Sequence, residues 1–421
     1  MELKYRALEG MNDVLPEQSP LWQYVESRWR EHCRQYGYGE IRTPILETAE
    51  LFERSVGETS DIVSKEMYVF QRGEERYALK PEGTAPVVRA YLEHGLYGAG
   101  GVHKLYYITP FFRGERPQKG RYRQAHQFGA EIFGAASPLA DAELLCMVMD
   151  FFLSLGLPAD ALELRLNTIG CPECRPAYRE AVRTFGRAHF DRLCKNCQAR
   201  LERNPLRILD CKECFEITAA APPIDPYLCD ACRTHFEGLQ SLLKTLDVAY
   251  VRDHRLVRGL DYYTRTTFEV VAAQGLGAQN ALCGGGRYDG LVEELGGPPT
   301  PALGVGIGVE RTLLVLQALN APLPAPPRMD AFVVAFGEAA RPLALQIAQQ
   351  LRRAAIATDL DLEGRSPKAQ MRLANRSGAR FAILLGESEL EQNAATVKDL
   401  QTHEQYTVSQ TELATWIKTR L

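Results

Sequence analysis

Apolar and polar positions follow two different patterns along the chain. Near the C-terminus, short apolar runs at 331–336 and 381–386 are typical of buried strands, and 357–362 fits a third strand. Between them, residues 341–353 repeat apolar side chains at helical intervals. Strands that alternate with helices predict an α/β unit built on a mainly parallel sheet.

The longer N-terminal body has another pattern. A helix is predicted around Leu21 to Tyr36, and the closely spaced short strands after it indicate a mostly antiparallel sheet. From about 170 to 240 the pattern becomes helical and rich in cysteine, which indicates an insertion into one domain. The fold class is therefore α+β, with a separate α/β domain at the end. The predicted strands are 40–46, 66–70, 75–80, 104–112, 124–134, 267–273 and 304–310.

Proline marks the boundary between these two regions. The segment APLPAPPR, Ala321–Arg328, has four prolines in eight residues. Proline lacks a backbone N–H and disfavours helix in the residue before it, so this segment is predicted to be a stiff, extended linker. We therefore expect one domain over 1–320, a linker over 321–328 and a second domain over 329–421.

Composition excludes several classes of protein. The chain has 421 residues, 45% hydrophobic and 24% charged, which is typical of a globular protein of two or three domains. Its net charge of −4 supplies no overall field that attracts nucleic acid, so any RNA contact has to use local patches. The N-terminal sequence lacks the apolar core of a signal peptide, and no apolar run approaches the roughly 18 residues of a membrane helix. A cytoplasmic protein with no membrane partner is expected.

Cysteine is concentrated in the predicted insertion. Of 11 cysteines, eight form four Cys-x-x-Cys pairs, with 19 residues between the first two pairs and 14 between the last two. In a reducing compartment such spacing is typical of structural four-cysteine zinc sites. Two ions, one ion or only reduced buried thiols all fit the spacing, and the pairing stays open. The eight candidate ligands are Cys171, Cys174, Cys194, Cys197, Cys211, Cys214, Cys229 and Cys232.

A basic segment separates two of the predicted strands. Residues 113–123 contain a single anion, Glu115, and Pro117 and Gly120 indicate a loop. Guanidinium groups bind phosphate oxygens bidentately, so this hairpin suits a polyphosphate or an RNA backbone. A solvated basic loop is the alternative. The cations are Arg113, Arg116, Lys119, Arg121 and Arg123.

Three later segments bring further candidates, each with an ordinary structural alternative. In 256–263, Arg258 can neutralise charge on a phosphate, or form a simple ion pair beside two core tyrosines. In 281–291, three consecutive glycines admit a ligand close to the backbone, or form a bulge. In 302–316, alternate glycines leave one strand face free for a flat ligand such as adenine, or for close packing, and Arg311 opens the next helix.

These segments, in this order, resemble the class II aminoacyl-tRNA synthetases, and specifically the histidyl-tRNA synthetases. Phe112–Glu115 is similar to the second class II motif, GVGIGVER at 304–311 to the third, and IRTPILE, with Pro44, to the first. RGLDYYTRT and GGGRYDGL resemble the two histidine-specific signatures, and KPEGTAP at 80–86 resembles the amino-acid-binding loop. The resemblance implies an antiparallel class II catalytic domain followed by an anticodon-binding domain.

The resemblance also implies an activity. Such an enzyme forms histidyl-adenylate from L-histidine and ATP, with Mg²⁺ accompanying the ATP, and then transfers histidine to the 3′ end of tRNA-His. Arg113 and Arg258 would hold the reacting α-phosphate and Arg311 the γ-phosphate, while Arg121 and Glu115 complete the ATP site. The first motif implies a homodimer.

The remaining implied residues bind the amino acid and the tRNA. A carboxylate and a tyrosine hydroxyl can satisfy both imidazole nitrogens, which rejects analogues strongly enough that no editing domain is needed. The family pattern gives Glu82, Thr84 and Gln127 to the α-ammonium group, Glu131 and Tyr263 to the imidazole with Tyr262 adjacent, and Arg116 and Gln118 to the acceptor end of the tRNA.

Two other functions fit parts of this sequence. Regulatory subunits of ATP phosphoribosyltransferase resemble a synthetase that has lost its arginines and its C-terminal domain, whereas this chain keeps Arg113, Arg258 and Arg311 and the segment after the linker. A zinc-dependent RNA-binding module is the second alternative, but RNA binding alone needs neither the alternate glycines nor the PEGTAP loop.

Overall fold

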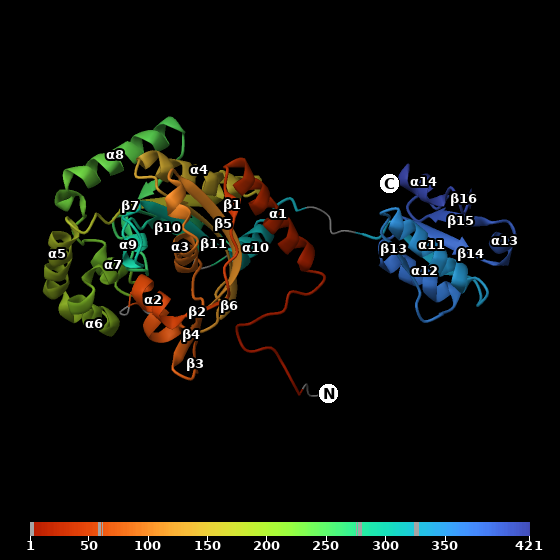
Figure 1. Cartoon of the computed structure of the whole chain (residues 1–421), viewed down its shortest axis with the longest axis horizontal. Helices are drawn as coiled ribbons and strands as arrows, with labels where there is room; N and C mark the ends of the chain where they lie inside the picture. The colour runs from red at the N-terminus through yellow and green to blue at the C-terminus, as the bar shows by residue number, and fades with distance from the viewer. Residues whose placement is uncertain (1–3, 58–59, 61, 275, 277–279, 324–327) are drawn as a thin grey trace. The chain divides into compact units, whose positions relative to one another are not determined.

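The computed structural model places the chain in two compact units, Met1–Pro324 and Ala325–Leu421 (Figure 1). It describes residues 4–57, 60, 62–274, 276, 280–323 and 328–421. Residues 324–327 of the expected linker lie outside the described residues, so the limits of the linker and of the domains stay predictions. Among the described residues, no helix combines the length and apolar character needed to cross a membrane.

In the described part of the first unit, eight strands form one sheet. Neighbouring strands are antiparallel except at the two edges, where β1 is parallel to β5 and β7 is parallel to β8. The mostly antiparallel sheet is therefore confirmed. In spatial order the strands are β1 (Gly39–Glu40), β5 (His103–Phe112), β6 (Gln124–Phe133), β11 (Ala302–Gly308), β10 (Ala281–Arg287), β9 (Thr264–Ala272), β7 (Leu162–Thr168) and β8 (Val251–Arg252).

The predicted strand 40–46 is wrong as a single element. Its first residue ends β1, and its last residue begins β2 (Leu46–Thr48), which pairs with β4 (Glu75–Leu79) and, through β4, with β3 (Val69–Arg72) in a smaller sheet. Pro44 lies in the gap and has no N–H to donate to a ladder. The predicted strand 66–70 likewise begins only at Val69, because Ile62–Glu66 forms a helical turn.

Helices cover one face of the large sheet. Helix α1 (Ser19–Gln35), which confirms the predicted first helix, buries Trp29 in a stack on Phe128 with ring centroids 5.6 Å apart. Helices α4 (Pro138–Ser154) and α10 (Val309–Ala318) complete the same core. The remaining helices of the sheet region are α2 (Ala49–Val56), α3 (Thr84–Glu93) and α9 (Leu291–Glu294).

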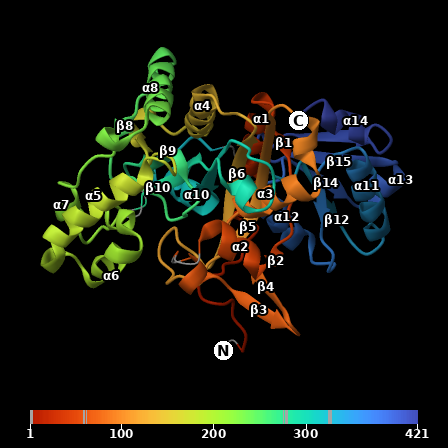
Figure 2. The ribbon, with the colours of Figure 1, turned by 60° about the vertical axis from the view of Figure 1, so that its left-hand side comes forward.

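The stretch between β7 and β8 is a helical insertion, as the sequence predicted. Figure 2 shows its helices grouped on one side of the first unit. Each Cys-x-x-Cys pair lies at the start of one of these helices. The helices are α5 (Arg175–Ala188), α6 (Lys195–Arg203), α7 (Phe215–Thr218) and α8 (Asp230–Thr245).

The second unit has a mixed sheet, so the prediction of a mainly parallel sheet is only half right. Strands β13 (Thr358–Leu360), β12 (Ala331–Ala335) and β14 (Phe381–Leu385) are parallel, as predicted. Strands β15 (Ala394–Asp399) and β16 (Gln405–Ser409) then add an antiparallel hairpin. Separate apolar clusters cover the two faces of the sheet. The helices are α11 (Arg341–Arg353), α12 (Pro367–Arg376), α13 (Glu387–Glu391) and α14 (Leu413–Lys418).

Candidate active site

A pocket opens on the sheet face opposite α1, α4 and α10. Successive residues of a strand point to opposite faces, so β6 sends Phe128 to the helical core and Gln127 to the pocket. The cavity has a volume of about 220 Å³ and is lined by residues from Glu82 to Arg311, so distant parts of the first unit meet there.

Four arginines from distant parts of the chain line this pocket. Arg113 and Arg121 come from the β5–β6 hairpin, Arg258 from the loop before β9 and Arg311 from the first turn of α10. Backbone carbonyls orient two of them. Arg113 Nε donates to the Pro81 oxygen at 2.9 Å, and Arg311 donates from Nε to Gly120 and from Nη1 to Ala281, both at 2.8 Å.

The arginines share one electrostatic environment. Burial lowers the pKa of Arg311, and the positive charges of Arg121 and Arg113 lower it further. Burial also lowers the pKa of Arg113 and of Arg121. An arginine does not lose its proton in proteins. The lowered pKa values of these three arginines therefore show that positive charge is concentrated in the pocket, where water solvates it poorly. Negatively charged groups are therefore the ligands that this pocket suits.

Two carboxylates hold members of this cluster. Glu115 forms an ion pair with Arg121, and Glu269, on β9, forms one with Arg258. Burial acts to lower the pKa of Arg258, but the charge of Glu269 leaves that pKa above its ordinary value. Glu269 was missed in the sequence, because only the strand register shows that it faces the loop that carries Arg258.

Glycine at 284 makes room for Arg258. A Cβ at this position would lie 2.2 Å from Arg258 Nη2. The next two glycines pack against protein backbone: added Cβ atoms at Gly285 and Gly286 would each lie 2.2 Å from a carbonyl oxygen. Register shifts in the pairing of β10 with β9 agree with the bulge that the sequence offered as an alternative. The triple glycine therefore packs the sheet and seats one arginine.

Next to the arginines lies a pocket of buried tyrosines. Tyr262 and Tyr263 line it, with ring centroids 4.8 Å apart, and the ring of Tyr288 is 5.6 Å from that of Tyr262. Glu82 closes the start of α3 by accepting the backbone N–H groups of Thr84 and Ala85, each at 2.7 Å.

Glu131 lies one layer behind these tyrosines. Its carboxylate accepts hydroxyl hydrogen bonds from Thr84 at 2.9 Å, Tyr107 at 3.0 Å and Tyr288 at 2.5 Å. Complete burial raises the pKa of Glu131 to about 8, although the hydroxyls of Tyr288 and Thr84 oppose that rise. Glu131 and its hydroxyl partners therefore form a buried hydrogen-bond network, in which burial favours the protonated carboxyl.

The alternate glycines of β11 make room for side chains of the neighbouring strand β6. Cβ atoms at Gly304 and Gly306 would lie 1.6 Å from Glu131 Oε2 and 2.0 Å from Gln127 Nε2. These glycines therefore leave space for two side chains of β6, and only part of the strand face stays open to a ligand. The packing alternative offered by the sequence explains these two positions.

The structure brings most of the predicted site residues together. Arg116 and Gln118 do not line the pocket; they are exposed on the β5–β6 hairpin, where the Gln118 N–H donates to the Arg121 carbonyl at 3.0 Å. Glu131 is completely buried behind the residues that line the pocket. The predicted residues that line the pocket are Glu82, Thr84, Arg113, Glu115, Arg121, Gln127, Arg258, Tyr262, Tyr263 and Arg311.

Sequence reasoning missed several residues around this pocket besides Glu269. Tyr288 lines the pocket and donates to Glu131, and Tyr107 donates to the same carboxylate. Glu310 accepts from the His126 backbone N–H at 3.0 Å and contacts its Nδ1 at 2.8 Å. Tyr288 stands inside the GGGRYDGL segment, so its signal was present but unassigned.

The cysteine pairs form two groups of four. Cys171 and Cys174 meet Cys229 and Cys232, while Cys194 and Cys197 meet Cys211 and Cys214. The pairing that the sequence left open is therefore nested: the outer pairs join each other and the inner pairs join each other. All 11 cysteines lie in the described part of the chain, and each has a free thiol. Each group of four can hold a metal ion.

The antiparallel sheet and its arginine-lined pocket define a class II aminoacyl-tRNA synthetase. A family model described as histidyl-tRNA synthetase matches residues 10–312, and one described as anticodon binding domain matches residues 330–420. The chain belongs to the histidyl-tRNA synthetase family.

Curated relatives and a solved structure agree with this membership. A histidine–tRNA ligase of Desulforamulus reducens is 49% identical over 98% of this chain and 98% of its own length. A histidine–tRNA ligase of Pelotomaculum thermopropionicum is 50% identical over 95% of this chain and 94% of its own. The crystal structure of apo S. aureus histidyl-tRNA synthetase matches with a TM-score of 0.83 and 38% identity, over 98% of this chain and 100% of that one. The predicted family and fold class are thus confirmed.

Proposed function

We propose that the chain is a histidine–tRNA ligase that works in two steps. A carboxylate oxygen of L-histidine attacks the α-phosphorus of ATP, the bond to the β-phosphate oxygen breaks, and pyrophosphate leaves. The terminal 3′ ribose of tRNA-His then attacks the carbonyl carbon of histidyl-adenylate, and AMP leaves. The observation that carries this proposal is the convergence of Arg113, Arg258 and Arg311 beside a tyrosine pocket.

In the first step the attacking and the attacked groups are both anionic. Arg113 and Arg258 hold the α-phosphate and lower this electrostatic barrier, since preorganised cations in a dry site stabilise developing charge strongly. Arg311 holds the γ-phosphate, and Arg121, fixed by Glu115, completes the triphosphate site. ATP enters with Mg²⁺ as part of the substrate. Buried, carbonyl-anchored guanidinium groups support this assignment.

The tyrosine pocket binds histidine. Glu82, Thr84 and Gln127 take the α-ammonium group, and Tyr263 and Glu131, with Tyr262 adjacent, recognise the imidazole. Glu131 lies behind the tyrosines, so it acts on the ring through the hydroxyls of its network. A buried polar network with every member paired rejects ligands that leave a partner unsatisfied.

Two parts of the chain contact tRNA-His. Arg116 and Gln118, exposed on the hairpin beside the pocket, approach the acceptor end. We assign residues 1–320 to catalysis and 329–421 to anticodon binding, and the family model that matches 330–420 supports the second assignment. The 11 free thiols fit a reducing, cytoplasmic location.

The chain acts as a homodimer. Two apolar side chains are exposed on one face of the small sheet that follows the first class II motif: Leu46 is 46% exposed on β2, and Phe70, which the register places on the same face, is 49% exposed on β3. Both strands flank β4. Large exposed apolar side chains grouped in this way are typical of a protein–protein interface.

Histidine-dependent exchange of pyrophosphate into ATP tests the first step. We expect the wild-type chain to show it and Arg258→Ala to lower it by 10² or more, because removal of one preorganised donor costs about 10²–10³ in rate. Histidine binding, measured by calorimetry, should stay detectable. The matched control is Arg165→Ala, which removes another ion-paired arginine of the same domain from outside the pocket.

The outcomes separate the alternatives. A regulatory subunit binds histidine without any exchange, and an RNA-binding module does neither. Near-normal exchange by Arg258→Ala would remove this residue from catalysis, and absence of exchange in the wild-type chain would contradict the proposed function.

A further inference from the structure

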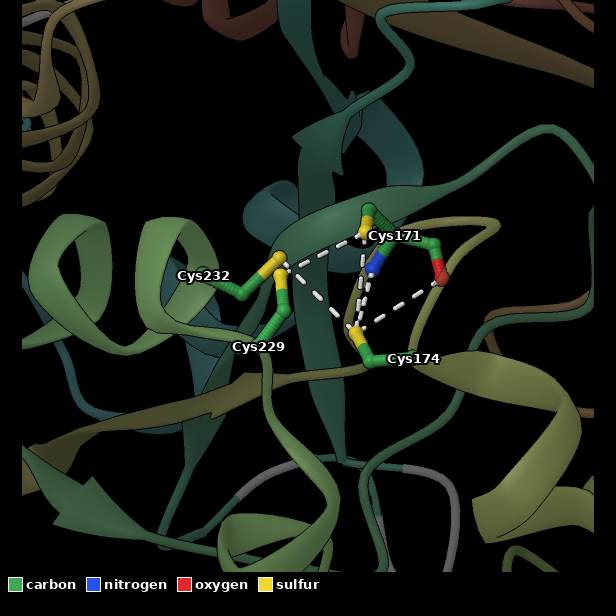
Figure 3. A group of neighbouring side chains, drawn as sticks. All are labelled: Cys171, Cys174, Cys229 and Cys232. Carbon is green, nitrogen blue, oxygen red and sulfur yellow. Dashed lines mark hydrogen bonds between the residues drawn. The ribbon is translucent and has the colours of Figure 1, made fainter.

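The insertion contains two clusters of sulfur atoms that the proposed reaction does not use. In the outer cluster, Cys171 and Cys174 precede α5, while Cys229 and Cys232 lie at the start of α8 (Figure 3). The inner cluster consists of Cys194, Cys197, Cys211 and Cys214. Within each cluster all four Sγ atoms lie within 4.8 Å of one another.

The sulfur separations match the edges of a tetrahedron around one ion. A tetrahedral zinc site with Zn–S bonds of about 2.3 Å has S···S edges of about 3.8 Å. The outer cluster has Sγ–Sγ distances of 3.6 Å from Cys171 to Cys174, 3.8 Å from Cys171 to Cys229 and 3.9 Å from Cys174 to Cys232. Disulfide sulfurs are only about 2.05 Å apart, and a cluster of several iron atoms needs more space than one ion.

The inner cluster repeats this geometry. Cys194 and Cys211 have their Sγ atoms 3.7 Å apart. In both clusters a backbone N–H donates to a sulfur: Cys171 N to Cys174 Sγ at 3.1 Å, and Cys194 N to Cys214 Sγ at 3.2 Å. Such bonds stabilise thiolates, which are the form that binds metal. Each cluster also has two buried and two partly buried sulfur ligands, which is typical of a closed structural site.

We propose that the insertion binds two zinc ions, each through four cysteine thiolates and with nested connectivity. The outer ion joins the first and last pairs and closes the insertion at its base. The inner ion joins the second and third pairs. Four sulfur ligands in a tetrahedron select zinc among the common divalent ions. Neither site has an open position for a water or a substrate, so both ions are structural.

The outer site also supports the histidine pocket. Arg175 directly follows Cys174, and its Nη2 donates to the backbone carbonyl of Tyr263 at 2.5 Å and to that of Gly170 at 3.3 Å. The cysteines and the pocket tyrosines belong to one continuous apolar core. Loss of the outer ion should therefore raise the KM for histidine more than the KM for ATP.

Metal content of the purified full-length chain tests the proposal. After growth with added zinc and gel filtration in reducing buffer without chelator, we expect two zinc ions per chain. X-ray absorption at the zinc edge should show four sulfur neighbours at about 2.3 Å. This measurement uses the wild-type chain, so it does not depend on whether a variant folds. One zinc ion per chain or fewer, bound iron, or nitrogen and oxygen neighbours would overturn the proposal.

Paired substitutions test the nested connectivity. Cys171→Ser with Cys229→Ser removes ligands from the outer site only and should leave one zinc ion. Cys171→Ser with Cys194→Ser takes a ligand from each site and should leave none. The alternative is that pairs adjacent in the sequence share an ion, with one ion bound within 171–197 and the other within 211–232. In that case the first double variant would leave no zinc ion and the second would leave one. Cys146→Ser, in a partly buried thiol of α4, is the control and should keep both ions.

Discussion

At the scale of single residues, the pocket depends on side chains whose surroundings are unusual. Glu131 is a completely buried carboxyl with three hydroxyl donors, and Arg258 occupies space that only a glycine at 284 leaves open. Each feature can be tested by one substitution. Glu131→Gln should change the pH dependence of stability, and Gly284→Ala should change the position of Arg258.

Glu131 should make stability depend on pH. The ordinary pKa of 4.5 applies in the unfolded chain, and burial raises the pKa of Glu131 to about 8 in the fold. Between these values the folded state keeps a proton that the unfolded state has released, so this group makes stability fall as pH rises, up to about pH 8. In Glu131→Gln that contribution is absent.

Thermal unfolding midpoints measured between pH 5 and pH 8 test this expectation. The midpoint of wild type should decline more than that of the variant, and Glu163→Gln, a substitution of a partly buried, ion-paired carboxylate on β7, should behave like wild type. Equal pH dependence in all three chains would show that Glu131 titrates as an ordinary carboxyl.

Gly284→Ala should displace Arg258 without unfolding the chain. The added Cβ would meet the guanidinium at 2.2 Å, and a flexible side chain moves more readily than a backbone. We expect pyrophosphate exchange to fall by about tenfold or more, since positioning errors of an ångström cost up to 10²-fold. The control is Gly290→Ala, where an added Cβ meets nothing within 4 Å. Unchanged exchange in Gly284→Ala would mean that Arg258 needs no defined position.

At the scale of elements, a buried ion pair joins β10 to α4. Arg287, fully buried, donates to the Asp141 carboxylate from Nη2 at 2.6 Å and from Nε at 2.9 and 3.0 Å, and it also donates to the carbonyls of Ala135 and Ser137. His235 of α8 lies 3.4 Å from the same carboxylate. This group therefore ties the sheet, α4 and the insertion together. The GGGRYDGL segment serves packing as much as ligand binding.

Breaking this pair should destabilise the first unit strongly. Arg287→Met leaves the Asp141 carboxylate buried without its main partner, which typically costs about 3–5 kcal/mol of unfolding free energy. The double variant with Asp141→Leu should recover much of that loss, because no buried charge is left unpaired. Thermal or denaturant unfolding measures both. If the double variant were less stable than Arg287→Met, the buried charge would not be the cause.

The elements show what sequence patterns can and cannot predict. Long apolar runs such as β5, β6, β12 and β14 were predicted, because all of their residues are buried or partly buried. The break at Pro44 and the hairpin of β15 and β16 were not. In short edge strands such as β16 most side chains are exposed. Such strands need few apolar residues, so the pattern of apolar positions does not predict them.

Some residues of the site could likewise be predicted from the sequence, and others could not. Its arginines were predictable because each stands in a distinctive local segment. Glu269 and Tyr107 were not, because their roles come from strand register across the sheet. The cysteine pairing also escaped prediction: the separations between successive pairs are similar, and only the folded helices show which pairs meet.

At the scale of the whole molecule, association through the small sheet is expected. Phe70→Glu places a charge on the face of the small sheet that also exposes Leu46, and it should shift the chain from dimer to monomer. Sedimentation velocity at micromolar concentration measures this shift. Leu345→Glu, which changes a 54% exposed apolar residue of the second unit, is the control and should leave the dimer intact. A monomeric wild-type chain would remove the dimer from the account.

The most direct test of the account is a crystal structure with histidine and a non-hydrolysable ATP analogue bound. We expect the α-phosphate between Arg113 and Arg258, the γ-phosphate on Arg311, and the imidazole among Tyr262, Tyr263 and the Glu131 network. A triphosphate that contacts none of the three arginines, or an imidazole outside the tyrosine pocket, would contradict the account.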